Sequence, residues 1–401
     1  MVTPACGAHA TDAGGAELTP MIRRFSTLYV GHIELEQCGL AGIPADDRRY
    51  PNARLSETFE TATALAQATD ALGYDTLWLA EHHFQHEGYE CIPNIPLLAV
   101  DLAHRTRRIK IGCAFNIVPT WHPLRLAEDY ATADILTKGR VVFGVGRGYH
   151  SREVETFGNP MLDAEANREL FEEQVEIILK AFREESFSHQ GKHYTIPPEV
   201  PYRGYRLKEI TLVPRPVHQP LEVWQPIVSG SARSLDFMAR HGIKGVISAT
   251  AEQFVERWLR DYQAAAGRHG RNLQLGEDVI LGFRMCLDDS EARAMDRARP
   301  YFEEHAKFMA PLGMLRYSEE QVKAVAARQA QSPTTATLEN GVANRSWLCG
   351  PPAHIVGYLK EVEARYPGLE HIMIAWALGT PRELMIEQLT RFAREVMPAF
   401  R

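Results

Sequence analysis

Residues 73–84 read GYDTLWLAEHHF, an apolar run that ends in Glu-His-His-Phe. Residues 74–80 have the length and composition of a buried strand. Gly73 is a stop signal for the helix that the apolar spacing predicts over residues 56–72. The sequence on both sides repeats this unit of an amphipathic helix and a short apolar strand. Such alternation predicts a parallel sheet with helices packed outside it.

Eight strands are expected in the whole chain. They lie over residues 25–33, 74–80, 109–118, 140–145, 223–229, 245–248, 279–287 and 371–376. Further helices are expected over residues 122–136, 165–182, 231–240 and 290–308, and another from Thr250, which forms a capping-box pattern with Gln253. The alternation fits a closed eight-fold barrel or an open doubly wound sheet. No strong composition break divides the 401 residues, so we expect one α/β domain, a (β/α) TIM barrel with loop insertions, over residues 21–401.

Three stretches depart from this pattern. Residues 1–20 are small and polar, carry no secretory signal, and are expected to be a disordered leader. Residues 187–220 are rich in proline and aromatic residues and predict a hairpin insertion. Residues 310–344 are polar and rich in Ala, Gln and Thr, which fits a mobile lid or a solvated excursion.

The composition excludes several classes of protein. Hydrophobic residues make up 45% and charged residues 24%, the ordinary globular mixture. A net charge of −7 argues against nucleic-acid binding, and no apolar run approaches the length of about 18 residues that a membrane span needs. The six cysteines are scattered without a C-x-x-C pair, which favours a reducing cytoplasm.

The residues that follow the strand at 74–80 are candidates for catalysis. In a barrel, side chains just past the carboxyl end of a strand line the active site, and histidine transfers protons near neutral pH. His82 and His83 stand there. A packed core histidine is the alternative interpretation. No metal site is expected, because His82, His83 and His86 lack the H-E-x-x-H spacing and no cysteine joins them.

Two further strand ends carry features that suit an anion. Arg147 stands between Gly146 and Gly148, where small residues let a phosphate or carboxylate approach the guanidinium. The segment does not meet the G-x-G-x-x-G fingerprint, and a solvated surface turn is the alternative. Gly230 and Ser231 join a strand to a helix start, which could cradle a phosphate or could simply cap the helix.

Several segments together resemble the bacterial luciferase-like family of flavin-dependent monooxygenases. They are GYDTLWLAEHHF at 73–84, IGCAFNIVPTWHPLRLAEDYATADILTKGRVVFGVGRGY at 111–149, VETFG at 154–158 and GTPRELMIEQLTRFAREVMPAF at 379–400. The resemblance implies a barrel with insertions that binds reduced FMN at its carboxyl-terminal mouth. It also implies a separate flavin reductase, a homodimer, and oxidation of a small organic substrate by a peroxyflavin formed with dioxygen.

The resemblance also implies roles for single residues. His82 matches the histidine that assists the flavin peroxide chemistry, and Arg147 matches the arginine that binds the FMN phosphate. The other matching positions, all at the cofactor, are Gly230, Ser231 and Ser234 at the phosphate, and Ala114, Phe115 and Asn116 beside the flavin ring, with a cis peptide bond expected between Ala114 and Phe115.

The chain departs from luciferase at several places, among them Gly230, where luciferase carries glutamate. Gly146 replaces a reactive cysteine, and Phe115 is bulkier than the family's alanine. These departures argue against a long-chain aldehyde substrate and light emission. Two other functions stay open: a deazaflavin-dependent oxidoreductase that transfers hydride without dioxygen, and a non-catalytic flavin-binding partner subunit. His82 argues against the second, since such a subunit need not keep a histidine at the mouth.

Overall fold

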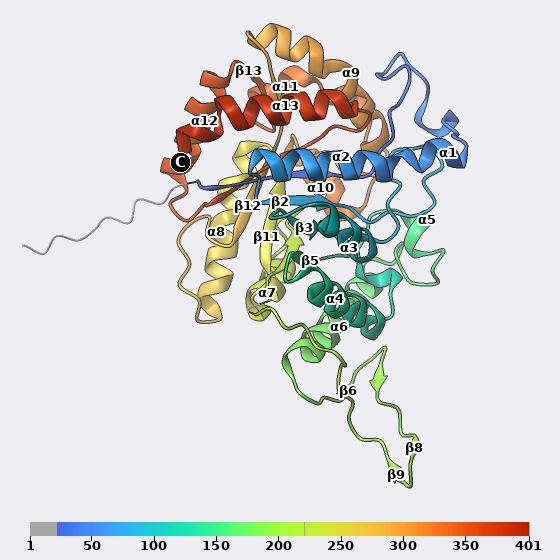
Figure 1. Ribbon diagram of the computed structural model, residues 1–401. Helices are drawn as coiled ribbons and strands as arrows, with labels where there is room; N and C mark the ends of the chain where they lie inside the picture. The colour runs from blue at the N-terminus through green and yellow to red at the C-terminus, as the bar shows by residue number, and fades with distance from the viewer. Residues whose placement is uncertain (1–21, 220, 401) are drawn as a thin grey trace, which may run out of the picture.

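Eight parallel strands close into a barrel in the computed structural model, which describes residues 22–219 and 221–400 (Figure 1). The leader expected over residues 1–20 lies outside the described residues. The barrel strands, in their order around it, are β1 (Arg24–Tyr29), β2 (Thr76–Leu79), β3 (Lys110–Cys113), β5 (Val141–Gly146), β10 (Val223–Pro226), β11 (Lys244–Ser248), β12 (Val279–Leu287) and β14 (His371–Ala375). Pairing of β14 with β1 and of β10 with β5 closes the ring. The barrel prediction is confirmed, and the open doubly wound sheet is excluded.

Alternate side chains of the strands fill the barrel. This interior cluster consists of Trp78, Ala114, Val142, Trp224, Val246, Ile280 and Met373, with Leu28 and Phe115 packed against it. Trp78 and Gly112 are partners in the register of β2 and β3. A Cβ atom on Gly112 would lie 2.2 Å from the Trp78 ring, so glycine makes room for the indole. The inside of the barrel below its carboxyl-terminal mouth is therefore a packed core.

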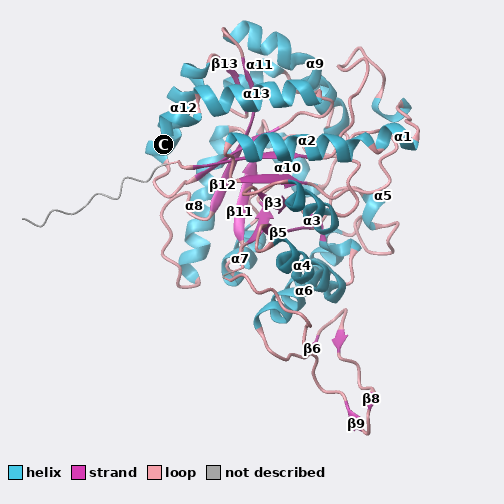
Figure 2. Cartoon of the chain, viewed as in Figure 1, coloured by secondary structure: helices cyan, strands magenta, loops and turns pink. Residues whose placement is uncertain are grey.

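Helices surround the barrel (Figure 2). They are α1 (Asn52–Leu55), α2 (Glu57–Leu72), α3 (Ile95–Arg105), α4 (Pro123–Thr137), α5 (Ser151–Val154), α6 (Ala164–Arg183), α7 (Ala232–His241), α8 (Glu252–Arg268), α9 (Glu291–Met309), α10 (Glu319–Ala327), α11 (Leu338–Ala343), α12 (Pro352–Arg365) and α13 (Arg382–Glu395). Gly73 ends α2 in the left-handed conformation, as its position predicts. No helix within the described ranges is long and apolar enough to cross a membrane.

Some elements differ from expectation. Helices α3 and α12 and the short strands β4 (Asn116–Ile117) and β13 (Trp347–Gly350) lie in stretches where sequence periodicity gave no helix or separate strand. Strand β13 pairs with the far end of β12. The capping box at Thr250 is wrong: α8 begins at Glu252 after Ala251, and the Thr250 hydroxyl donates instead to the Ser248 carbonyl at 3.1 Å.

Two irregular segments leave the barrel. Residues 187–219 form two short hairpins, β6 (His189–Gln190) with β7 (Thr195–Ile196), and β8 (Pro201–Tyr202) with β9 (Tyr205–Arg206), which extend away from the barrel in Figure 1. Residues 310–344 carry α10 and α11. Arg316 of this second segment donates from Nη2 to the carbonyl of Ser248 at the end of β11, 2.6 Å away. The segment therefore touches the carboxyl-terminal mouth of the barrel.

Candidate active site

Four neighbouring strands carry the residues that the sequence singled out. His82 follows β2, Ala114 and Phe115 follow β3, Arg147 follows β5, and Ser231 follows β10. These strands are consecutive in the barrel, and each residue lies at its strand's carboxyl end. The structure thus brings the predicted residues to one half of the mouth.

His82 is buried, with 5% of its surface exposed. Its backbone N–H donates to the Ile92 carbonyl at 2.9 Å, which fixes the chain directly after β2. Its Nδ1 lies 3.1 Å from Oε1 of Glu153 on α5, and its Nε2 lies 3.1 Å from the hydroxyl of Tyr149. Both ring nitrogens therefore have a defined partner, which holds the imidazole in one orientation.

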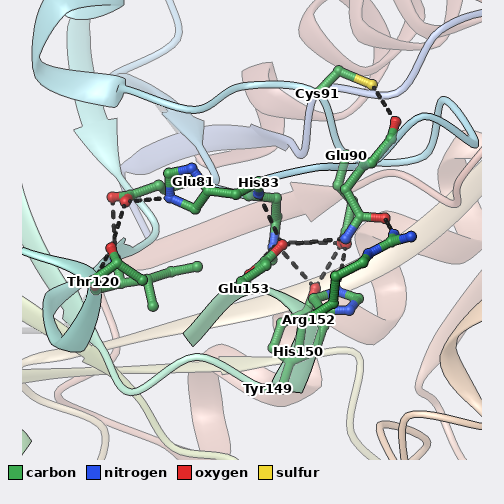
Figure 3. A network of polar contacts seen from close by, with 12 residues as sticks. Glu81, His83, Glu90, Cys91, Thr120, Tyr149, His150, Arg152 and Glu153 are labelled. Carbon is green, nitrogen blue, oxygen red and sulfur yellow. Dashed lines mark hydrogen bonds and ion pairs between the residues drawn. The ribbon is translucent and has the colours of Figure 1, made fainter. Parts of the chain in front are cut away.

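The Tyr149 hydroxyl continues the chain of contacts (Figure 3). It donates to Oε1 of Glu90 at 2.6 Å, and Nε2 of His150 lies 2.9 Å from the other oxygen of the same carboxylate. Glu153 also accepts from the backbone N–H of His83 at 2.9 Å. The result is a buried network with a carboxylate at each end and an imidazole and a phenol between them.

The charges of this network set its protonation. Burial alone lowers the pKa of His82, but the carboxylates of Glu90 and Glu153 overcome burial and raise it to about 9. Burial raises the pKa of Glu153, but His82 outweighs it and brings the value down to about 2. At neutral pH His82 is a cation that donates from both nitrogens. It can therefore give up a proton, and it is not free to accept one.

His83 has a different environment. Its Nε2 lies 2.9 Å from Oε1 of Glu81, and its ring packs edge-on against Phe157. Glu81 accepts in turn from the Trp121 indole at 2.7 Å and from the backbone N–H of Ile117 at 3.1 Å. The two histidines point to separate groups, as expected for neighbours in an extended chain. Through these hydrogen bonds Glu81, which follows β2, holds β4 and the residues after it against the end of β2.

The peptide bond between Ala114 and Phe115 is cis, as the family resemblance led us to expect. Ala114 belongs to the barrel interior, and Phe115 packs against it. A Cβ atom on Gly146 would lie 3.1 Å from Cβ of Phe115, so glycine at this position leaves room for Phe115 beside the end of β5. Asn116 is fully buried and donates to the carbonyl of Gly144 at 2.8 Å. Asn116 thus anchors this turn to β5.

Arg147 stands in a positively charged surrounding. Burial, followed by the charges of Arg168 and Arg328, lowers its pKa to about 9. Its Nη1 donates to the amide oxygen of Asn167 at 3.5 Å, and Nη2 of Arg328 donates to the same oxygen at 2.7 Å. Among the described residues no carboxylate forms an ion pair with Arg147. A guanidinium in this setting favours a bound anion.

Helix α7 begins after β10, the strand next to β5 in the barrel. Ser231 is its N-cap, with the hydroxyl oxygen accepting from the backbone N–H of Ser234 at 3.4 Å. The Ser234 hydroxyl accepts from Gln225 at 3.0 Å. Gly230 has a φ of +62°, and a Cβ atom there would lie 2.3 Å from Trp258. The turn requires glycine, and the helix start adds free N–H groups that suit an anion.

One group of side chains could offer ligands to a cation. The ligand atoms of His82, His150 and Glu153 lie within 4.8 Å of one another. In the structure Nδ1 of His82 is hydrogen-bonded to Glu153, and Nε2 of His150 is hydrogen-bonded to Glu90. Hydrogen bonds thus account for this arrangement.

Sequence reasoning missed Glu90, Tyr149, His150 and Glu153. Tyr149 and His150 directly follow the Arg147 segment, but Glu90 comes from the loop before α3. No periodic spacing links these positions, because the barrel brings them together only when β2 and β5 are both formed. The signal that existed was the run of charged and aromatic residues after β5.

The chain matches known proteins over most of its length. The sequence profile of the luciferase-like monooxygenase family matches residues 40–368. The oxygenase component of a flavin-dependent trigonelline monooxygenase from Acinetobacter baylyi is 24% identical over 360 residues, which cover 86% of this chain and 90% of that protein.

Solved structures share the fold. The oxygenating constituent of 3,6-diketocamphane monooxygenase from Pseudomonas putida, in complex with FMN, has a TM-score of 0.70 at 18% identity, covering 94% of this chain and 98% of that one. An F420-dependent secondary alcohol dehydrogenase has a TM-score of 0.65 at 13% identity, covering 95% of this chain and 100% of that one. At these identities the structures show the barrel fold alone. The family match over residues 40–368 is what decides membership: this chain belongs to the luciferase-like monooxygenase family.

Proposed function

We propose that the chain is the oxygenase component of a two-component FMN-dependent monooxygenase that oxidises a small organic substrate with dioxygen. The unneutralised Arg147 beside the start of α7 is the observation that carries the choice of a phosphorylated flavin. Family membership and the name of the relative from Acinetobacter baylyi support the reaction class and a separate flavin reductase.

The residues present fit FMN. Arg147 supplies a cation without a carboxylate partner among the described residues, and Gly230 and Ser231 supply a helix start. On the adjacent side, Ala114 and Phe115 offer an apolar surface that suits a flat ring. When bound, reduced FMN supplies the electrons with which dioxygen is activated.

The protein's own residues then have distinct tasks. Arg147 and the Ser231 turn bind and orient the phosphate end. His82 holds a proton at Nε2 in a hydrogen bond to the Tyr149 hydroxyl, and the proton can reach a developing negative charge on oxygen when that hydrogen bond opens. Glu153 orients the ring through Nδ1 and keeps it charged, and Tyr149 connects Nε2 to Glu90. These contacts make His82 a general acid in the proposal.

Quaternary structure and location are part of the proposal. Leu97 on α3 is 72% exposed, and Leu136 on the adjacent α4 is also exposed. We propose a homodimer from the family resemblance, and analytical ultracentrifugation would test it. Cys38, Cys91, Cys113, Cys286 and Cys349 are unpaired, in keeping with a reducing cytoplasm.

Cofactor titration tests the proposal directly. The full chain is titrated anaerobically with reduced FMN, reduced riboflavin and reduced F420, followed by oxygen-uptake measurements with a flavin reductase and NADH. Reduced FMN is expected to bind at least about tenfold more tightly than riboflavin, because a charge-assisted phosphate contact contributes about 1.5–3 kcal/mol. Preference for F420 without oxygen uptake would establish the deazaflavin alternative. Flavin binding with no oxidation of any substrate would support the non-catalytic subunit.

A further inference from the structure

Two arginines lie at the mouth of the barrel on the side away from the flavin residues. Arg284 is in β12, and Arg316 precedes α10. Strands β11 and β12 stand across the ring from β2 and β3, which lead to His82 and to the cis peptide. A substrate held between these two sides would lie across the mouth from the strand that leads to His82.

Arg284 points into the mouth. Ile280 of the same strand is in the barrel interior, whereas Leu281 and Phe283 face the outer core. Because side chains alternate along a strand, Arg284 lies on the Ile280 side, one pleat above Gly282. Gly282 pairs with Ser248 and with Met373, the last interior layer on this side. Arg284 therefore lies directly above the packed core.

Arg316 is locked beside it. Its Nη2 donates to the carbonyl of Ser248 at 2.6 Å, and its Nε donates to the Thr250 hydroxyl at 3.1 Å. Its backbone carbonyl accepts from Ala251 at 3.1 Å. Burial and then the charge of Arg284 lower the pKa of Arg316 to about 10, which reflects two cations held close together.

The two guanidinium groups lack a counter-charge. Within residues 22–219 and 221–400, neither forms an ion pair with a carboxylate, and Nε of Arg284 is buried without a hydrogen-bond partner. His305 of α9, which is 4% exposed, has an unpartnered Nδ1 in the same region. Burial and then Arg284 and Arg316 hold the pKa of His305 well below its usual range, so it is neutral. A partly buried pair of cations beside unpartnered polar atoms is costly unless an anion binds there.

The neighbouring charges favour a monoanion. The charge of Arg316 lowers the pKa of Tyr149, although burial and Glu90 raise that pKa overall. The Tyr149 hydroxyl lies 3.1 Å from Nε2 of His82. Beyond Tyr149 stand the carboxylates of Glu90 and Glu153, which would repel a doubly charged phosphate more than a carboxylate. A guanidinium fork matches a carboxylate in shape as well as in charge.

We propose that Arg284 and Arg316 bind the carboxylate group of the organic substrate, so that the oxidised carbon lies near His82. The proposal rests on the proposed monooxygenase function and names its substrate class as small organic acids. His305 donates one further hydrogen bond from Nδ1 to the same group.

Calorimetric titration of the full chain tests the site without turnover. The probes are acetate, benzoate and octanoate, each compared with its uncharged carboxamide, and inorganic phosphate, all with and without saturating FMN. At least one carboxylate is expected to bind about tenfold or more tightly than its amide. Arg284→Gln and Arg316→Gln should each weaken it about 10- to 100-fold, the range for charge-assisted hydrogen bonds. Arg260→Gln, at a side chain 61% exposed on α8, should not change it.

Three results would overturn the assignment: no preference for any carboxylate over its amide, a preference that survives both substitutions, or tighter binding of phosphate. A parallel FMN titration separates substrate from cofactor. Both variants should keep the wild-type FMN affinity, and an equal loss of FMN affinity would mean that the arginines serve the flavin. Because the carboxylate titrations without FMN need no flavin, failure of FMN to bind would refute the proposed function alone. Melting curves confirm that each variant is folded.

Discussion

The Nε2 atom of His82 lies 3.1 Å from the hydroxyl oxygen of Tyr149, and that hydroxyl donates onward to Glu90 at 2.6 Å. The phenol proton is thus committed to the carboxylate, so the phenol oxygen accepts from His82. Glu153 occupies the other nitrogen of the ring. The direction of every hydrogen bond in this chain agrees with a protonated imidazole.

Replacing His82 by glutamine should spare FMN binding and damage oxidation. Loss of a general acid costs about 10²–10⁴-fold in rate, so product formation should fall at least about tenfold while hydrogen peroxide release rises. Product and peroxide are quantified together at a fixed supply of reduced FMN.

His83→Gln is the matched control, because its ring contacts Glu81 and Phe157 and does not enter the Tyr149 network. It should affect stability more than product yield. Full coupling of reduced flavin to product in His82→Gln would show that this histidine has only a structural role. A chelator should leave both proteins unchanged.

The activity should depend on pH through the charge of His82. Its folded pKa of about 9 lies above the ordinary value of 6.5, so the acid form, and the stability it contributes, is fully present below about pH 6.5 and is lost as the pH rises through about 9. Glu153→Gln removes one of the charges that raise this pKa. The alkaline limb of the turnover profile should therefore move toward lower pH.

A positional effect alone would lower activity at every pH without moving that limb. Histidine NMR titration gives the pKa in the wild type and in Glu153→Gln. Glu155→Gln is the control, since Glu155 accepts from the backbone N–H groups of Met161 and Leu162 and lies outside the network. An unchanged limb in Glu153→Gln would contradict the electrostatic account.

Arg147→Ala should weaken reduced FMN by about 1.5–3 kcal/mol and leave riboflavin affinity unchanged, because only FMN carries the phosphate. Fluorescence titration measures both ligands. Arg105→Ala, at an exposed ion pair with Asp101 on α3, serves as the control. Equal FMN affinity in wild type and Arg147→Ala would remove the phosphate assignment.

The strands were predictable because burial on both sides gives continuous apolar runs, such as the one before Glu81. His82 and Arg147 were predictable because a barrel collects residues from strand ends at one mouth. The carboxylates that charge His82 were not, since Glu90 and Glu153 meet it only through tertiary packing. Helix α3 was also missed, although Asn94 caps it by accepting from the backbone N–H of Leu97. Arg284 left a visible signal, one charge inside the apolar run 279–287.

Arg284 and Arg316 should respond in opposite directions to replacement by methionine. Arg284 has an unpartnered Nε and no ion pair among the described residues, and its guanidinium lies 5.9 Å from the centre of the Trp347 ring, so Arg284→Met removes a charge that has no carboxylate partner. Replacing buried charges by apolar groups of similar volume is often neutral or stabilising by about 1–4 kcal/mol. We expect the lower end of that range, a rise in Tm of about 2 °C. Arg316→Met instead loses the bonds to Ser248 and Thr250 and should lower Tm. Scanning calorimetry of the two variants without ligand measures both shifts. A large loss of stability in Arg284→Met would show that Arg284 serves mainly to stabilise the fold. That result would contradict the proposal that Arg284 binds a substrate carboxylate.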